Sequence, residues 1–109
     1  MARISLRIDF AEDRRLGPGK VLLLERIGEH GSIAAAGRSM GMSYRRAWLL
    51  VEELNRLTGQ PLVAAQVGGS RGGGASLTPL GLELARRYRA AEAAALAATR
   101  DVMQGFEAA

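Results

Sequence analysis

The stretch GSIAAAGRSMGMSYRRAWLLVEEL, residues 31–54, holds two short helical segments separated by a tight turn. Ser32 is placed to cap the first segment, which is expected to close at Gly41. Ser43 is placed to cap the second, because its hydroxyl can accept a hydrogen bond from a free backbone N–H at a helix start. The second helix is expected over residues 44–57. Two helices joined by a short turn that contains glycine predict a helix-turn-helix.

Two arginines occupy a position where a helix does not usually place them. Tyr44, Arg45 and Arg46 fall in the first turn of the second helix, whose free N–H groups already carry about half a positive charge. Pairing with Glu52 or Glu53 is the alternative, but these acids lie six to eight residues on. Side chains pair well on a helix three or four residues apart. We therefore expect the anion to come from outside the chain, as DNA phosphates and base edges do at a recognition helix.

The apolar residues of this helix repeat at helical spacing and predict its inward face. That face comprises Ala47, Val51, Leu54 and Thr58, with Tyr44 and Leu50 on its flanks. Trp48 is interpreted as a packing residue at the domain edge, with stacking on DNA as the less favoured alternative. Leu49 points away from the inward face and either contacts a thymine methyl group or is simply an exposed leucine.

The segments before the helix-turn-helix predict a strand, a loop and a helix. Ile4, Leu6, Ile8 and Phe10 alternate with polar residues, the period of a half-buried strand. The polar run AEDRRLGPGK reads as a loop that ends near Pro18. The run KVLLLERIGEH then predicts a helix that turns Leu23, Leu24 and Ile27 inward and stops at Gly31.

A glycine-rich hairpin follows the helix-turn-helix, over about residues 62–77. Strand-like pieces at 62–67 and 75–77 flank the run GGSRGGG, which carries one arginine, Arg71. A nucleotide-binding phosphate loop is rejected for this run, because the Lys and Ser/Thr of that pattern are missing.

The last predicted element is a long helix over about residues 79–104, with Thr78 as N-cap and Pro79 at the first helical position. At 1.5 Å per residue it would span about 39 Å. A domain of this length has a radius of gyration near 13 Å, so the helix should overhang its own core. An apolar seam along it is expected to dimerise with a second chain, and fraying of the last turns is the alternative. The seam residues are Leu80, Leu84, Tyr88, Ala91, Ala95, Ala98 and Val102.

Composition favours a single domain of residues 1–109 that binds a polyanion. The chain has 15 basic and 11 acidic residues and a net charge of +4, and only Lys20 among the basic residues is lysine. There is no cysteine, one histidine and no set of a base and a nucleophile, so an enzyme is not expected. No signal peptide and no membrane-spanning run is found, so the chain is expected in the cytoplasm.

Strand, helix, helix, turn, helix, hairpin and helix is the order of a winged helix-turn-helix, here mainly α with a small β-hairpin. The runs GSIAAAGRSMGMSYRRAWLLVEELN, PLV and GGSRGGGASLTPLG resemble the N-terminal DNA-binding domain of the molybdate-responsive (ModE-type) transcriptional regulators. That domain is similar to the LysR-type winged helix. The resemblance covers essentially the whole chain.

The resemblance implies roles for particular residues. It places Ser43, Tyr44, Arg45 and Arg46 at the DNA-reading start of the recognition helix. It places Arg71, with Gly69 and Gly72, in a wing that touches flanking backbone or minor groove. The first strand and the long last helix correspond to the parts through which the family dimerises.

The family also has a C-terminal region that binds molybdate or tungstate. No such ligand-binding domain is found before Ala109, so no cofactor is expected within these residues and molybdate enters only through the resemblance. No small-molecule substrate is evident either.

The sequence thus predicts a homodimeric regulator that binds double-stranded DNA at a palindromic operator, and the resemblance implies that its target genes serve molybdenum use. A winged-helix protein-interaction adaptor, contacting its partner through Trp48 and Leu49, is the alternative.

Overall fold

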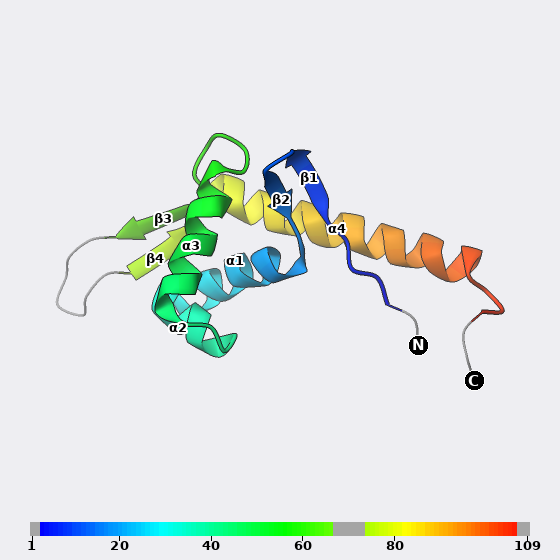
Figure 1. Cartoon of the computed structure of the whole chain (residues 1–109), viewed down its shortest axis with the longest axis horizontal. Coiled ribbons are helices and arrows are strands. Elements are labelled where there is room, and N and C mark those ends of the chain that lie inside the picture. The colour runs from blue at the N-terminus through cyan, green and yellow to red at the C-terminus, as the bar shows by residue number, and fades with distance from the viewer. Residues whose placement is uncertain (1–2, 67–73, 107–109) are drawn as a thin grey trace.

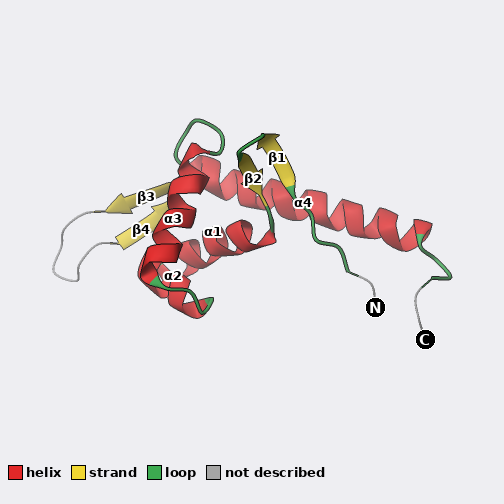
Figure 2. Ribbon diagram, viewed as in Figure 1, coloured by secondary structure: helices red, strands yellow, loops and turns green. Residues whose placement is uncertain are grey.

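The expected helices are present at nearly the expected positions in the computed structural model, which describes residues 3–66 and 74–106 (Figure 1). The elements in chain order are β1 (Ile8–Ala11), β2 (Arg14–Leu16), α1 (Pro18–His30), α2 (Ile33–Ser39), α3 (Tyr44–Arg56), β3 (Val63–Gln66), β4 (Gly74–Leu77) and α4 (Pro79–Val102). Figure 2 shows the predominance of helix over two small antiparallel strand pairs. The predicted winged helix-turn-helix, mainly α with a small β-hairpin, is therefore confirmed.

Serine and threonine side chains begin three of the helices, as the sequence predicts. The Ser32 hydroxyl accepts from the Ala35 N–H at 3.1 Å, and the Ser43 hydroxyl accepts from the Arg46 N–H at 3.1 Å. The Thr78 hydroxyl accepts from the Gly81 N–H at 3.0 Å. Each cap satisfies a backbone donor that the helix itself leaves free.

The N-terminal segment differs from the prediction of one strand over residues 4–10. Only Ile8–Ala11 forms a strand, and it pairs antiparallel with β2, which lies inside the predicted loop. A two-residue turn at Glu12 and Asp13 reverses the chain. A register irregularity between Asp9 and Ala11 disturbs the alternation, so Phe10 is 46% exposed although it was expected to face inward.

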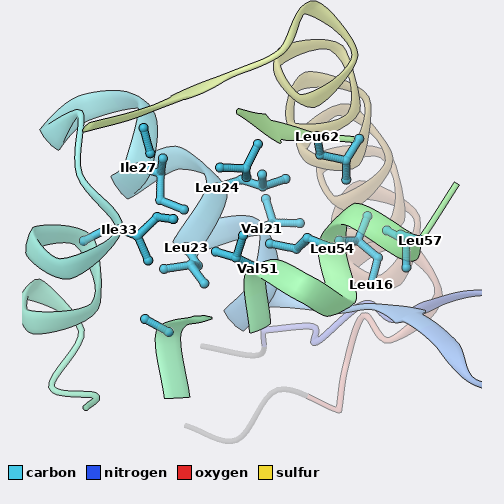
Figure 3. Close-up of a cluster of buried hydrophobic side chains, with 14 of the residues drawn as sticks. Leu16, Val21, Leu23, Leu24, Ile27, Ile33, Val51, Leu54, Leu57 and Leu62 are labelled. Carbon is cyan, nitrogen blue, oxygen red and sulfur yellow. The ribbon is translucent and has the colours of Figure 1, made fainter. Parts of the chain in front are cut away.

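The helices α1, α2 and α3, together with Tyr88 of α4 and a few residues of the strands and loops, form one apolar core (Figure 3). Leu23, Leu24 and Ile27 of α1 are fully buried, as their spacing predicts. The α3 side of the core is Ala47, Val51 and Leu54, followed by Leu57. The prediction that Thr58 belongs to this face is wrong: α3 ends at Arg56, Thr58 is exposed, and Leu57 is the buried residue there.

The helix α4 extends well beyond this core (Figure 1). It has 24 residues, and the chain measures 57 × 29 × 22 Å. The Cα radius of gyration of 16.0 Å exceeds the value near 13 Å for a compact domain of this length. The predicted overhang is confirmed. The buried residues of α4 are Gly81, Ala85 and Tyr88, all in its first half.

Tyr88 therefore does not belong to a seam for a second chain, as the sequence suggested. Its side chain is 1% exposed, and its hydroxyl donates to the Leu6 carbonyl oxygen at 2.6 Å. Burial raises the pKa of Tyr88 above its usual value. Apolar residues at helical spacing form the same sequence pattern whether they pack against a second chain or against the chain's own core.

Candidate nucleic-acid interface

The first turn of α3 forms an exposed positive end on the molecule. Tyr44, Arg45 and Arg46 are all exposed, and no acidic residue lies in this turn. The Ser43 cap leaves the remaining N–H groups of the turn free to meet an anion. In Figure 1 this end of α3 lies away from α4, on the opposite edge of the molecule.

Arg45 and Arg46 have no ion-pair partner among the described residues. Glu53, one of the two acids considered for them, instead lies 3.8 Å from the Lys20 ammonium. The two guanidinium groups are therefore available to carboxylate or phosphate from outside. Guanidinium suits phosphate oxygens and guanine edges because its N–H donors form a planar fork.

Positive charge continues from α3 onto the N-terminal half of the chain. Arg46 and Leu50 of α3 line a shallow groove with Arg15, Gly17 and Lys20. Gly17 caps α1 without any side-chain hydrogen bond. A polyanion that runs past the first turn of α3 would also meet the exposed Arg15, whereas the Lys20 ammonium lies beside Glu53.

Two aromatic side chains lie next to the arginines. The rings of Tyr44 and Trp48 are 6.1 Å apart and meet edge to face at 74°. Trp48 packs against the core, which confirms its interpretation as a packing residue, whereas Tyr44 is 60% exposed. The indole nitrogen of Trp48 is buried and has no acceptor within the described part of the chain. Leu49 is 48% exposed on the outer side of α3.

The hairpin of β3 and β4, which we call the wing, is attached to α3 by a side chain that the sequence analysis did not single out. The Asn55 carboxamide oxygen accepts from the N–H groups of Leu62 and Val63, both at 2.9 Å. Its NH₂ group donates to the Val63 carbonyl at 3.3 Å. Asn55 therefore fixes where the wing leaves α3. A polar residue directly after the buried Leu54 was the only signal for it in the sequence.

The wing strands pair as expected, with Val63 opposite Leu77 and Gln66 opposite Gly74. The Ala75 N–H also donates to the Gly31 carbonyl at 2.9 Å, which joins β4 to the turn between α1 and α2. Arg71 and Gly72, the predicted DNA contacts of the wing, lie outside the described residues. The base of the wing lies at the same end of the molecule as α3, away from the overhanging half of α4 (Figure 1).

The described residues hold no cluster of three or more His, Asp or Glu residues that could ligate a metal ion. Within the same residues, no helix is long and apolar enough to cross a membrane.

Comparison with known proteins identifies the family. Residues 20–82, more than half of the chain, match the family model described as bacterial regulatory helix-turn-helix protein, lysR family. The match begins in α1 and ends in the first turns of α4. It thus covers α2, α3 and the wing. A family of regulatory proteins is the class that the sequence predicted, and it is not a class of enzymes.

Three curated relatives are similar over most of this chain. The molybdenum-pterin-binding protein MopB of Rhodobacter capsulatus is 49% identical over 79 residues, 72% of this chain and 29% of the relative. The molybdenum transport protein ModE of Azotobacter vinelandii is 38% identical over 92 residues, 84% of this chain and 33% of the relative.

The DNA-binding transcriptional dual regulator ModE of Escherichia coli (strain K12) is 36% identical over 87 residues, 80% of this chain and 33% of the relative. The matched region is about a third of the length of each of these relatives.

Proposed function

Because the chain belongs to the lysR family of bacterial regulatory helix-turn-helix proteins, we propose that it is a sequence-specific DNA-binding transcriptional regulator. The observation that carries this proposal is the exposed first turn of α3, where Arg45 and Arg46 stand without an ion-pair partner among the described residues. In a helix-turn-helix the start of the second helix enters the major groove, where bases are read.

The proposed contacts divide by chemistry. The free N–H groups behind Ser43 bind a phosphate, since a helix N-terminus attracts anions. Arg45 and Arg46 contact guanine edges or phosphates, which are the usual partners of a guanidinium fork in DNA complexes. Tyr44 and Leu49 offer apolar surface to thymine methyl groups. Arg71 and Gly72 of the wing contact flanking backbone or minor groove.

The protein acts as a homodimer in this proposal, with the seam of α4 as the contact between the two chains. Leu80 and Val102 are 37% and 79% exposed. A second chain that covers such residues removes apolar area from water. The seam now comprises Leu80, Leu84, Ala91, Ala95, Ala98 and Val102. Two-fold symmetry would present two α3 helices to major grooves about 34 Å apart, on a palindromic operator.

We further propose that the regulated genes serve the use of molybdenum. The support is in the relatives' names, which mention molybdenum pterin and molybdenum transport. Molybdate itself is a candidate signal only by this similarity.

Selection from a random duplex pool tests the proposal. The purified chain is incubated with the pool at about 0.15 M salt, the ionic strength at which surface charges are screened as in cells. One arm contains molybdate and the other does not. The expected result is enrichment of a motif with two-fold symmetry. A folded, dimeric protein that enriches no motif would contradict the proposal and favour the adaptor.

A further inference from the structure

One arginine joins α4 to α1 at the place where α4 leaves the core. Arg89 forms two hydrogen bonds with the Glu25 carboxylate of α1, at 3.0 Å from Nε and 2.6 Å from Nη2. Its Nη1 donates to Glu92 of α4 at 2.9 Å. The side chains of Arg89 and Glu25 are 38% and 31% exposed, so the pair is partly shielded from water.

The other ion pairs recorded on α4 stay within that helix. Glu83 pairs with Arg86 and Arg87 at spacings of three and four residues. Glu92 likewise pairs with Arg89 three residues away. Such pairs stabilise a helix but cannot orient it. Among the described residues, the contact between Arg89 and Glu25 is the ion pair that bridges α4 to another helix.

Further contacts hold Arg89 in place where α4 meets α1. Its guanidinium carbon lies 5.7 Å from the ring centre of Tyr88, within the range of a cation–π interaction. The Tyr88 hydroxyl in turn donates to Leu6, so that the N-terminal segment is joined to the same turn of α4. The hydrogen bonds that the Arg89 guanidinium donates to Glu25, together with the one it donates to Glu92, raise the pKa of Arg89 above its usual value.

We propose that the ion pair of Arg89 with Glu25 sets the angle between α4 and the helix-turn-helix, and thereby restricts the half-site spacing that the dimer accepts. This inference rests on the proposed function, because it takes α4 as the dimer contact and α3 as the DNA-reading helix. Arg89 is then a positioning residue, since it acts on DNA recognition without touching DNA.

Because α4 continues well beyond Arg89, a small rotation at the ion pair of Arg89 with Glu25 displaces the far end of α4 by a large distance. The helix runs on from Arg89 to Val102, about 20 Å at 1.5 Å per residue. Rotation by about 10° at Arg89 would therefore shift the far end of α4 by about 3.5 Å relative to α3. That shift equals about one base pair along DNA, whose rise is about 3.4 Å. A rotational freedom of about 10° at this ion pair would therefore be enough to broaden the preference for one half-site spacing.

Glu25→Gln and Glu92→Gln are a matched pair of variants for the test. Each removes one carboxylate charge from Arg89, but only the first weakens a contact between two helices. The DNA assay uses the half-site enriched by the wild type, placed in inverted pairs whose separation varies one base pair at a time.

The wild type and Glu92→Gln should prefer one separation by about tenfold over its neighbours, a factor comparable to the cost of one mismatched base pair. Glu25→Gln should bind neighbouring separations within about threefold of one another, with unchanged affinity for an isolated half-site. Equal spacing profiles for all three proteins would overturn the inference. A uniform loss of affinity at every separation would also overturn it, because that is the effect of a merely structural residue.

A second measurement is independent of DNA. The chain has no cysteine, so the substitutions Glu52→Cys on α3 and Ala97→Cys on α4, which lies outside the seam, allow two spin labels to be placed without other changes. Both native residues are exposed. Diluted with unlabelled protein, the labels report the distance between α3 and α4 within one chain.

Glu25→Gln should broaden that distance distribution and Glu92→Gln should not. A broadened distribution in a protein that binds no DNA would refute the proposed function and leave the role of the ion pair standing. Identical distributions in both variants would refute the role of the ion pair.

Discussion

Replacing Asn55 with alanine removes the side chain that joins α3 to the wing. The wild-type carboxamide accepts from the backbone N–H groups of Leu62 and Val63 at 2.9 Å and donates to the Val63 carbonyl. Leu62 and Val63 are buried, at 0% and 3% exposure. Asn55→Ala therefore leaves two backbone donors beneath the surface without their acceptor.

The cost follows from these contacts. An unsatisfied buried donor costs about 1–3 kcal/mol, and a satisfied hydrogen bond contributes about 0.5–1.5 kcal/mol. Asn55 is itself partly exposed, so water can reach part of the space and the lower half of the range applies. We expect a loss of about 2–4 kcal/mol in the free energy of unfolding. In a domain of this size that loss lowers Tm by roughly 10–15 °C.

The assay is urea unfolding followed by circular dichroism. All variants are measured at one protein concentration, because the apparent stability of a dimer depends on it. Asn55→Asp is the matched control: it retains an acceptor for Leu62 and Val63, replaces the donor to the Val63 carbonyl with a carboxylate oxygen and adds a charge at a partly exposed position, so its loss should be smaller than that of Asn55→Ala. Thr58→Ala, at an exposed position outside α3, should change stability by less than about 0.5 kcal/mol. A loss below about 1 kcal/mol for Asn55→Ala would refute the reasoning, because the wing would then not depend on this side chain.

Three further changes test other parts of the account. Gly81→Ala should cost about 2–3 kcal/mol, measured by thermal unfolding, because its new Cβ would lie 2.2 Å from the Leu62 carbonyl oxygen. Burial raises the folded-state pKa of Tyr88; its contribution to stability should be complete below about pH 10, the unfolded pKa, and fall above it. A pH series of urea unfolding should show this fall in the wild type and less of it in Tyr88→Phe. Val102→Asp should weaken dimerisation by at least about tenfold in sedimentation equilibrium, because it places a charge in the apolar seam.

Each of these three changes has a result that would contradict it, and Gly81→Ala also has a matched glycine control. Gly28→Ala is the control for Gly81→Ala: its Cβ would meet only the flexible Leu77 side chain, with Cδ1 nearest at 3.4 Å, so stability should stay level or rise by up to about 1 kcal/mol. Equal stabilities for the two variants would contradict the close packing of α4 on Leu62. Identical pH profiles for the wild type and Tyr88→Phe would contradict the burial of the phenol. An unchanged dimer in Val102→Asp would show that α4 does not carry the contact.

Local signals predicted the helices well because helix starts and faces depend on nearby residues. Ser32, Ser43 and Thr78 each cap a helix through the residue three positions on, a relation that sequence spacing records directly. The buried residues of α1 and α3 follow helical spacing for the same reason. Thr58 was the exception, since the periodicity alone does not show where a helix ends.

Features that depend on distant parts of the chain escaped the sequence. The pairing of β1 with β2 needs a turn at Glu12 and Asp13, which lacks the glycine or asparagine that usually marks a hairpin. Tyr88 has the spacing of a seam residue, yet its partner is Leu6, 82 residues away.

The contact of Arg89 with Glu25 joins residues 64 apart, so no local pattern in the sequence indicates it. Asn55 is another such case, because its partners lie on the following strand and in the segment before it. The exposed arginines of α3 could be found in the sequence because their lack of a partner was visible from local spacing.

The most direct test of the central claim, that Arg45 and Arg46 bind DNA, is the salt dependence of DNA affinity. The wild type, the double variant Arg45→Ala/Arg46→Ala and the control Arg86→Ala are titrated with the selected duplex between about 50 and 200 mM salt. Arg86 is a matched arginine because it is exposed and pairs with Glu83 on α4, on a different helix from Arg45 and Arg46.

With 6–10 phosphate contacts, the wild type should lose about 10³–10⁵ in affinity across that range. Arg86→Ala should follow the wild type. The double variant should bind more weakly with a flatter slope, by about one unit for each arginine that contacts a phosphate. Superimposable curves for all three proteins would contradict the claim.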